Sequence, residues 1–242
     1  VSAFLLNRSS DLLVKKQLEL KKTQFDTDKD QKAKGYGDDV LWVGQTFGLG
    51  AFRGWNGKEP TLVAPVRSRT QRIISYGPLR TIVEVIDKGW QVDAAKASLN
   101  MTLRYTQYAG HRDTDVDVFF NRPVADYQFS TGIINVKNSV EFSDKKGLRA
   151  CWGTDWPSND TINFKRETVG LGIYIPMKYV RSEEPANKDN YAYVVGTPDK
   201  HLQYKVIYCS DNESFGYHSA KEWFAFLTEW KKEVEKPIQV KY

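Results

Sequence analysis

The sequence contains few of the residue types on which common metal and nucleophilic sites depend. It has two cysteines, two methionines and three histidines among 242 residues. No cluster of cysteine and histidine has zinc-ligand spacing, and no Gly-x-Ser-x-Gly segment marks a serine hydrolase. We therefore expect neither a metal nor another cofactor. The cysteines, Cys151 and Cys209, lie in predicted strands and leave open either one disulfide or two buried thiols.

Long apolar runs and a strong net charge are also missing. No stretch of about 18 apolar residues occurs, which argues against a membrane span. The chain has 35 basic and 30 acidic residues, giving a formal net charge of +5. Because this excess is small and spread along the chain, it indicates a solvated surface and argues against nucleic acid as a partner. The chain begins at Val1 without a signal-like segment, as expected of a mature form or of a chain whose upstream part is missing.

Strand-forming residues are abundant, with 13 Tyr, 12 Phe and 7 Trp beside many Val, Ile and Thr. Apolar and polar residues alternate, which predicts strands over 72–76, 79–87, 96–108, 114–120, 129–136, 140–142, 148–152, 168–175, 191–195 and 202–208. Turn residues separate them at 87–89, 110, 144–147 and 198–199. So many strands predict an all-β fold, a large curved antiparallel β-sandwich of the supersandwich kind. No linker or repeat divides residues 1–242, so we expect a single domain.

A helix is predicted near the C-terminal end. Ser219 and Glu222 have the spacing of a capping box, in which the two side chains satisfy free backbone N–H groups. Trp223, Leu227 and Trp230 then recur at helical spacing and predict an apolar stripe that packs on the sheet. A less regular segment over Leu12 to Leu20 reads either as a short helix or as a strand.

Glycines are concentrated in Gly35-Tyr36-Gly37-Asp38-Asp39 and in the segment from Gly44 to Gly50. The apolar residues at 40–43 and 47–52 predict a pair of strands bent by glycine. Neither the phosphate-binding loop nor the dinucleotide fingerprint is present. A bulge and turn that support a curved sheet and a loop that faces a ligand are about equally consistent with this pattern.

Residues 110–113, Gly-His-Arg-Asp, combine a base, a cation and an orienting carboxylate at a predicted turn that follows Tyr105. The simpler alternative is an ordinary polar turn. His201 is expected in an exposed turn and His218 in a packing or capping position. Asp113, Asp115 and Asp117 alternate on one strand face, where such a row is usually solvated.

Two tryptophans, Trp55 and Trp156, lie among turn residues and could offer an apolar face to a sugar ring. The glycine segments, together with Tyr76-Gly77-Pro78-Leu79-Arg80 and with Phe215-Gly216 before Glu222-Trp223, resemble a bacterial family found among polysaccharide-degradation genes. The family has long been labelled a domain of unknown function, and it includes an oligosaccharide dehydratase that acts on ulvan, a sulfated algal polysaccharide containing uronic acids. The resemblance also implies a further N-terminal β-rich part.

The resemblance implies elimination chemistry: the proton at C5 of a uronate is removed and the C4 substituent leaves. Such a reaction needs a cation for the carboxylate, a base and an acid. From residue chemistry, Arg80 or Arg112 fits the first role, His111 the second, and Tyr36 or Tyr105 the third. Asp39, Trp55, Trp156 and His218 complete the predicted substrate contacts.

The leading hypothesis is thus a carbon–oxygen lyase, a dehydratase of uronate-containing oligosaccharides in the periplasm or outside the cell. A polysaccharide lyase or a glycoside hydrolase acting on acidic glycans, a glycan-binding module without catalysis, and a structural sandwich attached to an enzyme remain alternatives. On the leading hypothesis, replacing His111 by Ala should lower turnover by about 10²-fold.

Overall fold

Antiparallel strands dominate the part of the chain that the structure, a computed structural model, describes: residues 40–157, 161, 162 and 164–237. One sheet has five strands, in the order β11 (Val180–Glu183), β12 (Asn190–Val195), β7 (Phe129–Ile134), β1 (Arg53–Trp55) and β2 (Pro60–Thr61). The other has eight, in the order β3 (Ser68–Ser75), β4 (Arg80–Trp90), β5 (Leu99–Tyr108), β6 (Asp113–Phe120), β13 (His201–Ser210), β10 (Glu167–Tyr174), β9 (Leu148–Asp155) and β8 (Val140–Ser143). A short 3-10 helix, η1 (Met177–Tyr179), leads into β11. The predicted all-β sandwich is confirmed.

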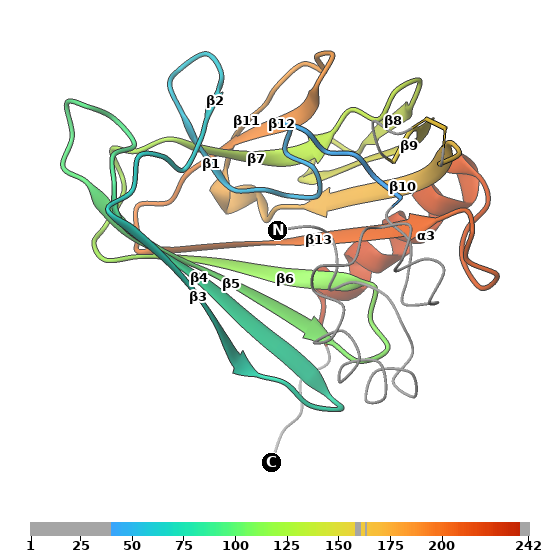
Figure 1. The fold of residues 1–242 in the computed structure, drawn as a ribbon, viewed down its shortest axis with the longest axis horizontal. Coiled ribbons are helices and arrows are strands. Elements are labelled where there is room, and N and C mark those ends of the chain that lie inside the picture. Colours follow the sequence, from blue (N-terminus) through green and yellow to red (C-terminus); the bar gives the residue numbers. More distant parts are fainter. Residues whose placement is uncertain (1–39, 158–160, 163, 238–242) are drawn as a thin grey trace.

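The core lies between the two sheets. Figure 1 shows the five-stranded sheet as one layer above β13 and β10, whereas β3, β4 and β5 slope away from it. Along β5, Leu99, Met101 and Leu103 are buried and point inward, as period-two alternation requires. Phe129 and Ile133 of β7 meet this cluster from the opposite sheet. The inner face of the eight-stranded sheet is therefore apolar where the five-stranded sheet covers it.

A buried arginine joins the layers away from this cluster. Arg149 of β9 is 1 % exposed, and its guanidinium donates to the carbonyls of Glu184 and Ala192 at 2.8 and 2.9 Å. Glu141 of β8 accepts from it at 2.8 Å. The charge is thus paired inside the sandwich, as a buried cation requires.

The predicted helix is confirmed as α3 (Ala220–Glu235), which packs on the outer face of β9 and β10 (Figure 1). The Ser219 hydroxyl accepts from the backbone N–H of Glu222, as the capping box predicts. Trp223 and Leu227 are fully buried. A Cβ at Gly170 would lie 2.8 Å from Nε1 of Trp223, so glycine is what lets the helix approach the strand so closely.

Some local predictions are wrong. Residues 40–43 and 47–52 form turns and extended segments with one isolated bridge, between Leu49 and Ile133, because glycines such as Gly44 and Gly48 adopt positive φ there. Residues 87–89 make an irregularity inside β4 rather than a turn, and Gly89 has φ 69°. The predicted turn residue His201 is the first residue of β13.

Three short strands, β1, β2 and β11, were not predicted, because two to four residues are too few to show alternation. Both cysteines are buried free thiols. No helix in the described ranges is both long and apolar enough to cross a membrane. The ambiguous segment from Leu12 to Leu20 lies outside the described residues.

Candidate functional site

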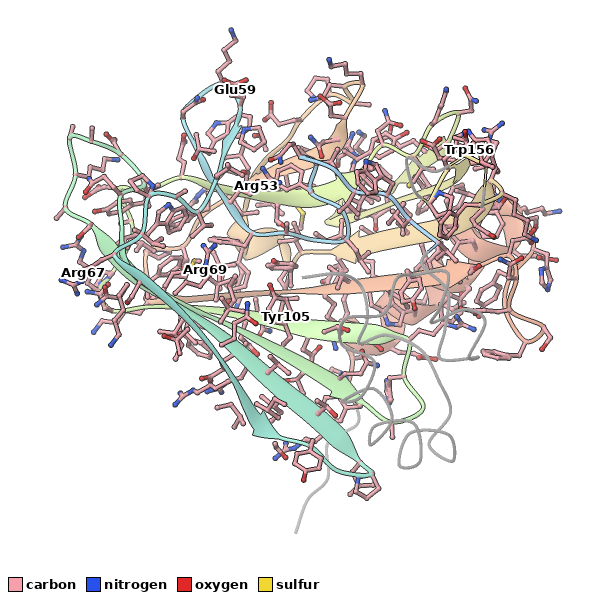
Figure 2. All side chains as sticks on the ribbon, viewed as in Figure 1. Arg53, Glu59, Arg67, Arg69, Tyr105 and Trp156 are labelled. Atoms are coloured by element: carbon pink, nitrogen blue, oxygen red, sulfur yellow. The ribbon has the colours of Figure 1, made fainter. Side chains whose placement is uncertain are left out.

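A polar hollow of about 190 Å³ opens beside β1 and the loop that joins it to β2. Three segments form its wall: the glycine-rich turn, the β1–β2 hairpin and the chain just before β12. Its lining residues are Gln45, Thr46, Phe47, Arg53, Glu59, Pro60, Asp189 and Asn190. Figure 2 labels Arg53 on β1 and Glu59 on the hairpin loop above it. We refer to this site as the Arg53 hollow.

Among the described residues that line this hollow, Arg53 is the only one with a cationic side chain. Its Nη2 donates to the Thr46 carbonyl at 2.6 Å, and its Cζ lies 5.6 Å from the centre of the Phe47 ring. Burial lowers the pKa of Arg53, although an arginine stays protonated in proteins. No carboxylate of the described residues forms an ion pair with it. Its remaining N–H groups can therefore bind an anion from solution.

The glycine-rich turn is folded by its own side chains. The Thr46 hydroxyl donates to the Val43 carbonyl at 2.6 Å and accepts from the backbone N–H of Gly48 at 3.0 Å. Asn190 closes the turn from the other side, because its Oδ1 accepts from the N–H of Phe47 at 2.8 Å. The turn that the sequence marked by its glycines thus forms one wall of the hollow.

Two exposed carboxylates, Glu59 and Asp189, line the same hollow. Each sits in a loop shaped by an asparagine: Asn56 Oδ1 accepts from the N–H of Glu59 at 2.8 Å, and Asn187 Oδ1 accepts from that of Asp189 at 2.9 Å. No side-chain partner among the described residues neutralises either carboxylate. The hollow therefore combines a cation with two groups that can accept a proton.

The predicted residues His111 and Arg80 lie elsewhere, at one end of the eight-stranded sheet. Arg80 is exposed and directly opposite Tyr108 in the ladder between β4 and β5. The ring of His111, 62 % exposed, is 6.0 Å from that of Tyr108, and its Nδ1 is 3.3 Å from Asp113 Oδ1. The structure thus places Arg80 and His111 beside one exposed tyrosine, Tyr108. We call the group formed by Arg80, Tyr108 and His111 the hairpin end.

Two other predicted residues are engaged in packing. Arg112 Nη1 is 2.5 Å from Glu213 Oε2, and the guanidinium lies over Phe215 and Tyr217. It therefore holds the loop before α3. Tyr105 packs against the main core, and burial, aided by the charge of Asp87, raises its pKa to about 12.

The remaining predicted contacts are scattered. Trp55, half-buried, ends β1 opposite Pro60, whereas Trp156 follows β9 at the far right of Figure 2. His218 is exposed: its Nδ1 is 3.0 Å from Asp211 Oδ1, and its backbone N–H donates to Glu222 at the start of α3. Tyr36 and Asp39 lie outside the described residues.

A family model described as "Domain of unknown function (DUF4861)" matches residues 8–240. The chain belongs to this family. No curated protein matches the sequence. The family's description states no activity, so the chemistry of this member must be argued from its own residues.

A second hollow, on the outer face of the eight-stranded sheet, differs from the first in that its charges are paired. It is lined by Asp115, Asp117, Tyr174, Pro176, Gln203, Tyr204, Lys205 and Val234. Lys205 forms ion pairs with Asp113 and Asp115, and His201 Nε2 is 2.7 Å from Asp117 Oδ1. The aspartate row is thus paired across the strands rather than merely solvated. Within the described ranges, no group of three or more His, Cys, Asp or Glu could hold a metal ion.

The sequence reasoning missed Arg53, Glu59, Asp189 and Asn190. One signal was available for the first: Arg53 lies three residues after Gly50, the last residue of the glycine-rich segment. Asn190 brought no such signal, since 143 residues separate it from Phe47. Only the fold brings these segments to one place.

Proposed function

We propose that this protein is a dehydratase of uronate-containing oligosaccharides, such as those of ulvan, and that the Arg53 hollow binds the uronate. The observation that carries the proposal is a half-buried guanidinium without a carboxylate partner among the described residues, in a polar hollow that also holds two carboxylates. Planar Arg and carboxylate groups form two parallel hydrogen bonds, which suits an acidic sugar better than a neutral one. The resemblance described above supports the same substrate class.

In the proposed reaction, Arg53 neutralises the uronate carboxylate and so stabilises the negative charge that develops when C5 loses its proton. A carboxylate of Glu59 or Asp189 accepts this proton. The C–H electron pair becomes the C4–C5 double bond and the C4–O bond breaks. The leaving hydroxide takes up the proton that the carboxylate accepted, so that one water is released and the carboxylate is restored. The product carries a double bond conjugated with its carboxylate.

Incubation of the protein with acidic oligosaccharides tests this proposal. We expect a rise in far-ultraviolet absorbance and, by mass spectrometry, the loss of one water without chain shortening. Chain cleavage with an unsaturated product would indicate a polysaccharide lyase, and cleavage with gain of water a glycoside hydrolase. Either result would overturn the dehydratase assignment.

A glycan-binding module without catalysis is the second candidate. The exposed side chains of Glu59 and Asp189 favour it, because a hollow open to water offers little of the water exclusion that catalysis uses. Calorimetry would then show saturable binding that depends on Arg53, and the ligand would be recovered unchanged. The proposed substrate class also implies a periplasmic or secreted protein, which fractionation of the native cells would test.

A further inference from the structure

Arg53 and Asn190 are hydrogen-bonded to one peptide group, the amide that joins Thr46 to Phe47. Nη2 of Arg53 donates to the Thr46 carbonyl at 2.6 Å, and the N–H of Phe47 donates to Oδ1 of Asn190 at 2.8 Å. The carbonyl and the N–H of an amide lie in one rigid plane, so a movement of this plane alters both hydrogen bonds. A single group thus connects the side chain of Asn190 with the guanidinium of Arg53.

Phe47 also supplies a second contact of the guanidinium. Its ring is 1 % exposed, and the ring centre lies 5.6 Å from Cζ of Arg53. Hydrogen bonds in a chain polarise one another, so the bond from Phe47 to Asn190 strengthens the carbonyl that accepts from Arg53. The direction of the guanidinium therefore depends on how firmly Asn190 holds this turn.

Backbone contacts fix the place of Asn190 independently of its side chain. It is the first residue of β12 and pairs with Ile134 of β7. Its backbone N–H donates to Oδ1 of Asn187 at 2.8 Å, and its carbonyl accepts from the N–H of Asn187 at 3.1 Å. A substitution of the Asn190 side chain leaves these bonds in place, so its variants should fold.

The amide of Asn190 holds the turn without adding a charge to the hollow. Its Oδ1 accepts a hydrogen bond as a carboxylate would, but the group is neutral. Glu84 shows the opposite case, because its carboxylate compensates the charges of Arg72 and Arg104. Nδ2 of Asn190 carries two N–H donors and has no hydrogen-bond partner among the described residues. This residue of the lining thus leaves the charge of Arg53 available and offers a further donor.

We propose that Asn190 is the positioning residue of the Arg53 hollow. Through the Thr46–Phe47 peptide it holds the guanidinium of Arg53 in one direction, and its NH2 group is a second, uncharged donor to the ligand. The identity of that ligand, a uronate, rests on the proposed function, whereas the contacts that carry the inference involve no ligand. A site held in this way is preorganised, because the guanidinium need not become ordered when the ligand binds.

Two substitutions separate the acceptor at this position from its lack of charge. Asn190→Ala removes the acceptor of the Phe47 N–H, whereas Asn190→Asp keeps an acceptor and adds a negative charge. The matched control is Asn100→Ala in β5, because Asn100 is also half-buried and its Oδ1 accepts from the backbone N–H of Gly89 at 2.9 Å. Two measurements need no sugar: hydrogen exchange of the Phe47 amide and the NMR order parameter of the Arg53 Nε–H group.

In Asn190→Ala we expect the Phe47 amide to exchange at least about tenfold faster than in the wild type, and the Arg53 order parameter to fall. Binding of glucuronate, measured by calorimetry, should weaken by about tenfold. Asn190→Asp should keep slow exchange and an ordered guanidinium but also bind glucuronate about tenfold more weakly. Only this second loss should shrink at high salt, because its cause is charge. Asn100→Ala should match the wild type in every measurement.

Phe47 exchange and Arg53 order that are the same in Asn190→Ala as in the wild type would overturn the inference, whether or not the protein binds a uronate. Full glucuronate binding by Asn190→Asp would overturn the part that assigns the NH2 group to the ligand. A wild type that binds no glucuronate and converts no acidic oligosaccharide would instead overturn the proposed function. The two measurements without sugar would still decide whether Asn190 positions Arg53.

Discussion

The outer face of the eight-stranded sheet and the Arg53 hollow both carry charged side chains. On the sheet these charges form ion pairs with one another, whereas among the described residues of the hollow they do not. On the sheet, Glu84 lies between two arginines, and its carboxylate oxygens are 2.7 Å from Arg72 Nη2 and from Arg104 Nη2. Lys205 likewise lies between two aspartates. In the hollow, Arg53 has a backbone carbonyl and an aromatic ring as neighbours but no carboxylate among the described residues.

This difference separates groups that stabilise the fold from groups available to a ligand. A paired charge has its hydrogen-bonding capacity used within the protein, and its removal leaves a partner uncompensated. A partly desolvated charge without such a partner contributes little to stability and can bind an ion of opposite sign from solution. We therefore expect substitutions in the hollow to alter activity and substitutions on the sheet to alter stability.

The largest effect on activity is expected for Arg53→Ala. Loss of the group that neutralises the developing charge should lower turnover by about 10²- to 10³-fold, the usual cost of removing one such donor. The free energy of unfolding should change by less than about 1 kcal/mol, because one side-chain hydrogen bond is lost. Arg53→Lys keeps the charge without the planar fork and should be intermediate.

Arg80→Ala is the matched control for Arg53, because Arg80 is an exposed arginine at the hairpin end with no ion pair among the described residues. Its turnover should match that of the wild type. Equal losses in Arg53→Ala and Arg80→Ala would contradict the contrast between the two regions. Product absorbance and thermal melting provide the two measurements.

The largest effect on stability is expected for Glu84→Gln. Glu84 is 1 % exposed, and its removal would leave two arginines uncompensated. Because both arginines reach solvent, we expect a loss of about 2–3 kcal/mol at neutral pH, below the full cost of breaking a wholly buried pair. Turnover should not change. The control is Glu229→Gln on α3, whose pair with Lys232 is exposed and should contribute at most about 0.5 kcal/mol.

The stability effect of Glu84 should also depend on pH. Burial alone would raise the pKa of this carboxyl, but hydrogen bonds and charges of Arg104 and Arg72 outweigh it and lower the pKa below its usual value. A lowered pKa stabilises the fold above the unfolded value of about 4.3, and this contribution is lost as pH falls through the folded value. Urea unfolding of wild type and Glu84→Gln should therefore differ at pH 7 and converge in strong acid.

Arg112→Ala should have a smaller effect on stability, about 1–2 kcal/mol. It removes an ion pair with Glu213 in which both side chains are largely covered, and it removes the guanidinium that lies over the rings of Phe215 and Tyr217. Turnover should stay at the wild-type level, although residue chemistry alone made Arg112 a candidate for the substrate carboxylate. If Arg112→Ala melted normally but lost most of its turnover, Arg112 would instead be a residue that binds the substrate carboxylate.

The fold was predictable from the sequence where single strands carry a strong signal of their own. β5 and β6 alternate over eight residues or more, and α3 has both a capping box and an apolar stripe. The failures are local. Residues 40–52 are apolar enough for strands, but glycines at positive φ turn the chain there. The pattern of apolar residues does not reveal these backbone angles.

The candidate site was less predictable, because it is assembled from segments far apart in the chain. The glycine-rich turn was noticed, but what makes it a site is contact with Arg53 and with Asn190, more than 140 residues away. Conversely, His111 and Arg112 are neighbours in sequence and separate in structure, since one side chain faces solvent and the other packs before α3. Adjacency in sequence was therefore a poor guide to adjacency in the site.

The smallest effect is expected for His111→Ala, for which sequence reasoning predicts a loss of about 10²-fold. The imidazole is 62 % exposed, and its side-chain contacts are Asp113 at 3.3 Å and the ring of Tyr108 at 6.0 Å. Because His111 lies at the end of the eight-stranded sheet and does not line the Arg53 hollow, we expect turnover to fall by less than about threefold and stability to change by less than about 0.5 kcal/mol. Steady-state absorbance and thermal melting measure both. A fall of about 10²-fold with normal melting would instead place the chemistry at the hairpin end. Arg80→Ala should then be equally impaired, because Arg80 lies opposite Tyr108 there and is a predicted cation for the substrate carboxylate.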